Sequence, residues 1–284
     1  MFKQISSFFW RSYRGWLYGL LSLVTAVIVS IGIPQPSYGI SWMELIFRGV
    51  QIIQLSSLSD SQEVKLGKQI NQQLLQGGQI TIYDNAQINR YVNKIGQRLA
   101  KTSDRRNIPY TFQVVKDKSI NAFATMGGFV YINTGLMRIA DNEAELASVV
   151  GHEIGHIVGR HAVKQMRDRA LAQGALSAAG LDQSTAVQMG VELALNRPHS
   201  RKAEFQADQL GLGNLQRAGY APSGMVSFMK KLQKQGGSIP AFLSTHPATS
   251  NRVVALQQAI NPEIANLGDG LNNQAYKSKI RSLR

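Results

Sequence analysis

The sequence predicts an α+β fold that is mostly helical and contains a small antiparallel sheet. Apolar residues recur at helical spacing through most of residues 61–260. Two short runs, 121–125 and 129–133, contain β-branched and aromatic residues and are separated by a turn with two glycines, which is typical of a β-hairpin. The run 110–115 predicts one further strand. Helical segments far outnumber strands and do not alternate with them, so the pattern favours α+β.

The helical segments follow from the spacing of apolar residues and from start and stop signals. The longest begins after Asp141 and Asn142, which suit an N-cap, and is predicted to run to about Met166. Residues beyond Asn261 show no regular pattern. The predicted helices, in chain order, are 61–76, 86–100, 142–166, 185–195, 201–217, 222–235 and 249–260.

Length and composition predict one globular domain with short appendages. The chain has 284 residues, of which 44% are hydrophobic and 17% charged, so it can bury a substantial core. We place the domain at residues 56–260, preceded by a linker at 40–55 and followed by a basic, irregular tail at 261–284. There is no cysteine. Disulfides and thiolate metal ligands are therefore excluded, including the thiolate-dependent deformylase type of hydrolase.

The first 39 residues are predicted to direct export. Lys3, Arg11 and Arg14 precede an uncharged apolar run at 17–33, and a small-residue triplet ends at Gly39. The segment is a signal peptide cleaved after Gly39 or an N-terminal membrane anchor. Both alternatives place the domain in the periplasm or another extracytoplasmic compartment.

The net charge of +14 is spread along the chain without a dense basic block. An ordinary basic surface explains this best, and attraction to a membrane surface or to acidic envelope assembly machinery is the alternative. No basic stripe interleaved with aromatic residues is present, so we expect no nucleic-acid partner.

His152-Glu153-Ile154-Gly155-His156 carries the clearest chemical signal in the sequence. On a helix, residues i and i+4 share a face about 6 Å apart, so both imidazoles can reach one ion. Glu153 lies on the adjacent flank, where it can act on water instead of binding the metal. Leu146, Val150, Ile154 and Ile157 form a separate apolar stripe that faces the core. The pattern predicts a catalytic site with one Zn²⁺ per chain.

Such a site needs a third protein ligand. On an unbroken helix His161 falls on the apolar stripe, away from His156, so we expect it to be a packed or capping residue. Glu204 and Asp208 lie one turn apart on a later predicted helix. We expect Glu204 to bind zinc and Asp208 to accept the second N–H of a histidine ligand.

Several motifs together resemble the HtpX and CAAX-prenyl-endopeptidase family of zinc metallopeptidases over roughly residues 60–260. The motifs are the HEIGH stretch, the Glu-x-x-x-Asp pattern in 201–208, the segment 121–136 and the late His246-Pro247 with Arg252. The similarity is greatest to exported members that degrade misassembled envelope proteins. It implies a gluzincin-type domain with zinc bound by His152, His156 and Glu204, and Glu153 as base. Members that cut prenylated substrates have several more membrane spans, so we do not expect that activity.

The resemblance also makes His246 and Arg252 candidate catalytic residues that stabilise the oxyanion. His246 has an alternative role, as a ligand that occupies the open zinc position in a resting state. For Arg252 the alternative is an ordinary surface arginine.

The segment 121–133 is the candidate substrate-binding strand, through β-augmentation by an extended polypeptide. The residues involved would be Asn121, Ala122, Phe123, Gly127 and Gly128. A plain core hairpin is an equally good explanation of the composition. The function predicted overall is zinc-dependent hydrolysis of peptide bonds in unfolded or misassembled envelope proteins. The alternative is a non-catalytic, chaperone-like zinc protein that holds such clients.

Overall fold

The computed structural model describes residues 52–55, 57–173, 181–196, 198–234, 240–247 and 250–283. The predicted export segment at 1–39 and most of the linker at 40–55 lie outside these residues. Among the helices that are described, none is both long enough and apolar enough to cross a bilayer.

Most of the predicted helices are confirmed, with ends that differ by a few residues. Side-chain caps explain several of the starts: Ser59 and Gln62 form a capping box, and Asn85 and Ser200 accept backbone N–H groups. The matching helices are α3 (Asp60–Gln76), α4 (Ala86–Thr102), α8 (Gln183–Asn196), α9 (Arg201–Arg217), α10 (Ser223–Lys234) and α12 (Ser250–Ala259).

The three predicted strands form one small sheet in the order β2-β4-β3. β3 (Ala122–Thr125) and β4 (Phe129–Asn133) make the expected antiparallel hairpin, joined by the 3-10 turn η1 (Met126–Gly128). β2 (Thr111–Val115), in contrast, pairs parallel to β4. The sheet is therefore mixed and not purely antiparallel, because β4 returns between β2 and β3 and leaves β3 at the edge.

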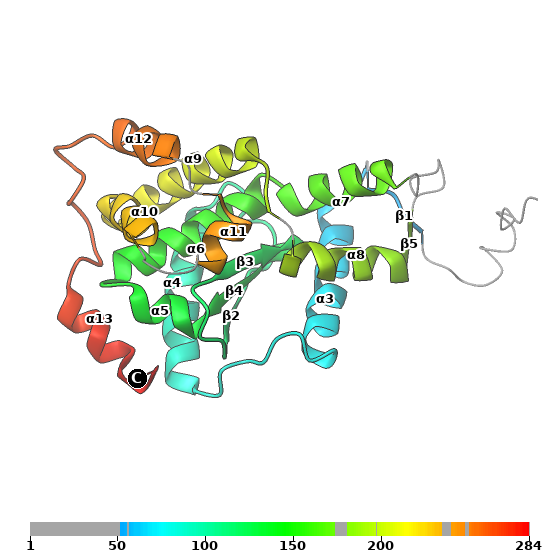
Figure 1. Ribbon diagram of the computed structural model, residues 1–284, viewed down its shortest axis with the longest axis horizontal. Coiled ribbons are helices and arrows are strands. Elements are labelled where there is room, and N and C mark those ends of the chain that lie inside the picture. Colours follow the sequence, from blue (N-terminus) through cyan, green and yellow to red (C-terminus); the bar gives the residue numbers. More distant parts are fainter. Residues whose placement is uncertain are drawn as a thin grey trace, which may run out of the picture. The chain divides into compact units, whose positions relative to one another are not determined.

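The sheet separates two hydrophobic clusters, and successive residues of β4 point to opposite sides of it. Val130 and Ile132 pack with α4 and with α6 (Glu143–Val158), whereas Phe129 and Tyr131 pack with α3 and α8. All five residues of β4 are buried. Helices therefore cover both faces of the sheet, with α4 and α6 on one side and α3 and α8 on the other, and α9 packs against α6 (Figure 1).

The HEIGH motif lies on α6, which crosses α9 at very close range. A Cβ added to Gly155 would lie 2.5 Å from the backbone oxygen of Ala207, and one added to Gly211 would lie 2.9 Å from that of Gly151. Only glycine permits this approach of the two backbones. The crossing places the acidic residues of α9 directly against the histidines of α6.

The segment 142–166 is two helices and not the single helix predicted. α6 ends at Val158, with Gly159 as its C-cap, and α7 (His161–Ala172) begins two residues after that cap. Between them, Arg160 adopts a left-handed conformation with φ 52°. This turn changes the direction of the chain, so a helical wheel drawn through residue 161 gives the wrong position for His161.

The tail beyond Asn261 is also more ordered than predicted. It contains the helix α13 (Asn273–Lys279) and the 3-10 turn η2 (Arg281–Leu283). Tyr276 is buried, and its hydroxyl donates to the backbone oxygen of Met137 at 2.6 Å. The remaining short elements are α5 (Thr134–Ile139), α11 (Ala241–Thr245), and the paired β1 (Ile52–Ile53) and β5 (Leu181–Asp182).

Candidate metal centre

Four buried side chains converge beside α6: His152, His156, Glu204 and His246. The Nε2 atoms of His152 and His156 are 3.0 Å apart. Glu204 Oε1 lies 3.3 Å from His156 Nε2 and 3.2 Å from His246 Nδ1. His246 Nδ1 lies 3.3 Å from His152 Nε2. The structure thus brings the three predicted ligands together and adds His246 as a fourth.

These separations fit a tetrahedral metal ion. Ligand atoms about 2.0–2.1 Å from a zinc ion at the centre of a tetrahedron are about 3.3–3.4 Å from one another. The donor set of imidazoles and one carboxylate is one that zinc prefers. The four residues could therefore hold such an ion.

The charge of the buried centre also fits a divalent cation. Counted with ionised carboxylates and with the neutral histidines that metal binding requires, the centre contains Glu153, Glu204 and Asp208 against the single guanidinium of Arg252. Two negative charges remain without a compensating group. Buried charge of this kind is costly unless it is paired or coordinates a metal.

Asp208 lies behind His152, as predicted, at 3.0 Å between its Oδ1 and the ring Nδ1. Burial lowers the pKa of His152, but the contacts to Asp208 and Glu204 outweigh burial and raise this pKa to about 9. Burial raises the pKa of Glu204, whereas the neighbouring histidines lower it to a net value well below the ordinary range. The centre therefore strongly favours a positive charge next to Glu204, and a metal ion supplies one.

Arg252 is buried behind the cluster, in contact with the two carboxylates of α9. Its Nε and Nη2 donate to the two oxygens of Asp208, each at 2.7 Å. Its Nη1 contacts Glu204 Oε2 at 2.6 Å and donates to the carbonyl oxygen of Pro247 at 3.0 Å. Only 1% of the residue is exposed. The guanidinium thus holds two carboxylates in the described arrangement and is not a surface arginine, whereas its predicted role as an oxyanion donor stays a prediction.

Glu153 is fully buried, and neither of its carboxylate oxygens has a hydrogen-bond partner among the described residues. Its Oε1 lies 3.5 Å from Nε2 of His246. Burial raises the pKa of Glu153, although the charges of His246 and His152 act in the opposite direction. An unpartnered buried carboxyl beside a metal-binding cluster suits a group that exchanges protons with water.

All five histidines of the chain gather at this centre. His161 and His199, which the sequence interpretation did not place here, flank His156 with ring centroids at 4.9 and 4.0 Å. Burial lowers the pKa of His161, and it lowers that of His199 to about 3, so both rings are neutral near pH 7. Gly159, a helix-stop signal two residues before His161, could have indicated the turn that brings His161 back.

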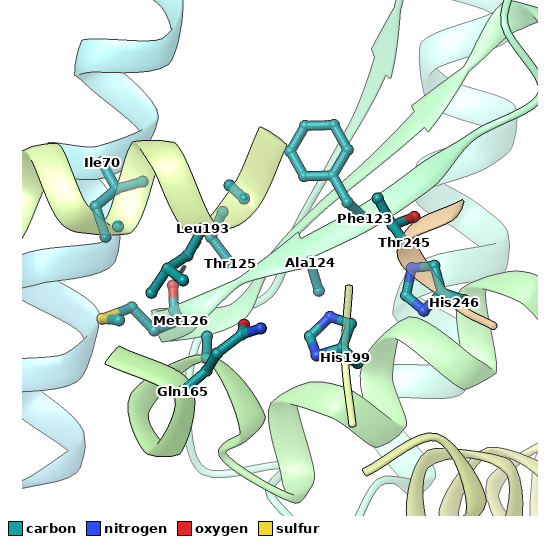
Figure 2. Close-up of a pocket in the computed structure, with 13 residues that line it drawn as sticks. Ile70, Phe123, Ala124, Thr125, Met126, Gln165, Leu193, His199, Thr245 and His246 are labelled. Carbon is teal, nitrogen blue, oxygen red and sulfur yellow. Dashed lines mark hydrogen bonds between the residues drawn. The ribbon is translucent and has the colours of Figure 1, made fainter. Parts of the chain in front are cut away.

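A small apolar cavity adjoins the cluster on the side of the edge strand β3. Figure 2 shows Ala124 of β3 above His199. His246 lies to the right of His199, and Leu193 of α8 lies on the left side of the cavity. Within the described part of the chain, β3 pairs with β4 alone and forms an edge of the sheet. The backbone N–H of His199 donates to the carbonyl oxygen of Thr245 at 3.0 Å, which ties the start of α9 to the segment carrying His246.

The predicted substrate residues divide into two groups. Ala122 and Phe123 belong to the edge strand, and Asn121 directly precedes it. Gly127 and Gly128, in contrast, are buried in the η1 turn. An added Cβ would lie 2.8 Å from Glu63 O at Gly127 and closer still to Pro109 O at Gly128. These glycines are needed for packing, and they do not face the edge of β3.

Residues 86–260 match the sequence model of peptidase family M48. The chain belongs to this family. The family predicted from the motifs is thereby confirmed, and so is a mostly helical fold with a small sheet. M48 is a family of metallopeptidases, and the cluster of this M48 chain is compatible with the metal that such enzymes use.

The M48 chain is similar to several named proteases. It is 31% identical to the beta-barrel assembly-enhancing protease of Escherichia coli (strain K12) over 223 residues, or 72% of this chain and 45% of that protein. It is 34% identical to the mitochondrial metalloendopeptidase OMA1 of Arabidopsis thaliana over 182 residues, covering 63% of this chain and 37% of OMA1. The chain thus spans less than half the length of these two relatives.

A third relative of this M48 chain matches over nearly its whole length. The metalloprotease LoiP of Escherichia coli (strain K12) is 28% identical over 254 residues, which is 84% of this chain and 98% of LoiP.

Proposed function

We propose that this M48 chain is a zinc-dependent endopeptidase that hydrolyses peptide bonds in unfolded or misassembled proteins of the cell envelope. The observation that carries the proposal is the combination of four buried side chains that could hold one metal ion with a buried Glu153 at their side, whose carboxylate makes no hydrogen bond among the described residues. A cluster that only stabilised the fold would have no use for a second carboxylate without a partner.

His152, His156 and Glu204 would hold the metal, which supplies Lewis acidity that acidifies water and polarises a carbonyl. Glu153 takes the proton of the attacking water and delivers it to the leaving amine. Asp208 Oδ1 lies 3.0 Å from Nδ1 of His152, where it would accept the N–H of that atom and so keep Nε2 of the ring free to bind the metal. Arg252 fixes Asp208 and Glu204 in place from behind.

His246 holds the position that water would need. Its Nδ1 completes the tetrahedron of ligand atoms, and its Nε2 faces Glu153. We therefore assign the described arrangement to a resting state, in which His246 must leave before substrate is hydrolysed. Once displaced, the same ring is close enough to serve as a hydrogen-bond donor during turnover.

The edge position of β3 supports recognition of extended polypeptides through their backbone. An added strand would place the scissile bond near the cluster, beside the small cavity between β3 and α8. Backbone recognition tolerates many sequences, which suits unfolded clients. The envelope location rests on the sequence of residues 1–39 and agrees with a relative that is named for enhancing β-barrel assembly.

One observation favours the alternative, a chaperone-like protein with a structural zinc. Four protein ligands around one ion form a closed site, and closed sites are typical of structural zinc. In that case Glu153 would have no chemical role.

Hydrolysis of casein by the zinc-loaded protein distinguishes the two functions. The wild type and Glu153→Gln are compared at equal zinc content, because glutamine keeps the shape of the side chain and removes the base. We expect the variant to retain zinc and to lose activity by about two to four orders of magnitude. Equal cleavage by both proteins, or none by either, would contradict the proposed endopeptidase function.

A further inference from the structure

The two proposed histidine ligands of α6 have different outer neighbours. Nδ1 of His152 faces a carboxylate, Asp208 Oδ1, at 3.0 Å. Nδ1 of His156 instead faces another imidazole, with 2.9 Å between it and Nδ1 of His161. The second nitrogen of His161, Nε2, lies 3.1 Å from Oε1 of Gln206. Three side chains from three helices thus form one hydrogen-bonded row.

Gln206, at the outer end of the row, determines the direction of each hydrogen bond in it. The amide oxygen of Gln206 only accepts, so Nε2 of His161 must carry the hydrogen. A neutral His161 then has a bare Nδ1, which accepts from Nδ1–H of His156. That leaves Nε2 of His156 without a hydrogen, and this atom is the one that faces Glu204 and His152.

We propose that His161 and Gln206 are positioning residues for the metal centre, which hold His156 in the tautomer and orientation that bind the ion. The inference rests on the proposed zinc site and adds a role for two residues that do not touch the ion themselves. A ligand histidine usually donates its other N–H to a carboxylate, a carbonyl or water, and these partners affect metal affinity. Here a neutral imidazole takes that place.

The backbone explains how His161 reaches this position. The left-handed Arg160 turns the chain after α6, and its Nε is held 3.0 Å from the buried carboxylate of Glu63. His161 is consequently the first residue of α7, and only 4% of it is exposed. The helix α9 carries Glu204, Gln206 and Asp208. Asp208 faces His152, and Gln206 ends the row that holds His156, so residues of one helix orient both histidines.

Charge gives a reason for a neutral partner at this position. The buried centre already has two more negative than positive groups, which one divalent ion neutralises. A carboxylate in place of His161 would add a further buried charge without compensation. The neutral imidazole accepts the hydrogen bond as a carboxylate would, but it adds no buried charge.

Two substitutions of similar size separate this role from simple packing. His161→Asn keeps an acceptor, because the amide oxygen of asparagine can replace Nδ1 of the imidazole. His161→Leu fills the space and leaves the Nδ1–H of His156 buried without a partner. Zinc affinity is measured by competition with a chelator, and thermal unfolding of the metal-free proteins reports whether each variant folds.

We expect His161→Leu to weaken zinc binding by about 10–100-fold and His161→Asn by much less. Unchanged zinc affinity in a folded His161→Leu protein would overturn the proposal. Nitrogen-15 NMR of the imidazoles in the zinc-loaded wild type gives a second test that needs no variant. The row requires the hydrogen of His161 on Nε2, and a hydrogen on Nδ1 would contradict it. Neither measurement depends on casein cleavage, so the proposed activity can fail independently.

Discussion

At the scale of single residues, the arrangement of partners around each side chain separates groups that act from groups that support. The carboxylate of Glu153 makes no hydrogen bond among the described residues, whereas Arg252 has its three nitrogens engaged by two carboxylates and a carbonyl. Contacts also distinguish two of the histidines. His246 belongs to the cluster of potential ligands, whereas His161 contacts the outer nitrogen of His156, Nδ1.

Replacing His246 by alanine removes the ring that completes the tetrahedron of ligand atoms. The other three proposed ligands remain, so we expect the site to open and the rate of casein cleavage to rise several-fold at unchanged zinc content. Initial rates of wild type and His246→Ala measure this. A large fall in turnover would show that donation to the oxyanion is the dominant role of His246.

Replacing Arg252 by methionine leaves two buried carboxylates without their cation. Breaking a buried ion pair from one side costs about 3–5 kcal/mol of unfolding free energy. Urea unfolding of the metal-free protein measures the loss. Arg217→Met is the matched control, because its ion pair with Asp104 is largely exposed, and it should cost about 0–1 kcal/mol. Similar losses in both variants would contradict the structural role of Arg252.

At the scale of secondary structure, the sequence allowed accurate prediction where the determinants are local. The i, i+4 pairs of α6 and α9 and the N-caps can be identified within a few residues of sequence. The parallel pairing of β2 with β4 could not, because it depends on contacts between distant segments. The turn at Arg160 was missed for a different reason: the apolar spacing continues through it, although Gly159 marks the end of α6.

The crossing of α6 and α9 predicts a specific intolerance at Gly155. A methyl group there meets the backbone of Ala207 at 2.5 Å, so Gly155→Ala should lose about 1–3 kcal/mol of stability. At Gly213, also on α9, the nearest atom to an added Cβ is the flexible end of Arg217 at 3.4 Å. Gly213→Ala should instead gain about 0.5–1 kcal/mol from helix propensity. Thermal unfolding of both variants checks the difference in sign.

At the scale of the whole described domain, the tail after residue 260 is part of the fold, although the family match ends there. Its buried residues are Tyr276, Ile280 and Leu283. Arg138 donates to the carbonyl oxygen of Leu283 at 2.6 Å, and Tyr83 donates to that of Ser282 at 2.9 Å. A short helix with polar residues around one tyrosine gives little sequence signal, because its order comes from packing.

Removing residues 273–284 should therefore destabilise the domain. Each fully buried large apolar side chain contributes about 1.5–3 kcal/mol, so we expect a loss of several kcal/mol in urea unfolding. The control is removal of Arg284 alone, which keeps all three buried side chains. A truncated protein as stable as the wild type would show that the tail does not contribute to the core.

The central claim is that the cluster at the crossing of α6 and α9 is the metal site. A crystal structure with diffraction data collected on both sides of the zinc absorption edge tests it most directly. We predict one zinc peak, within bonding distance of His152 Nε2, His156 Nε2 and a carboxylate oxygen of Glu204. A zinc peak bound elsewhere, or none in protein loaded with one equivalent of zinc, would contradict the account.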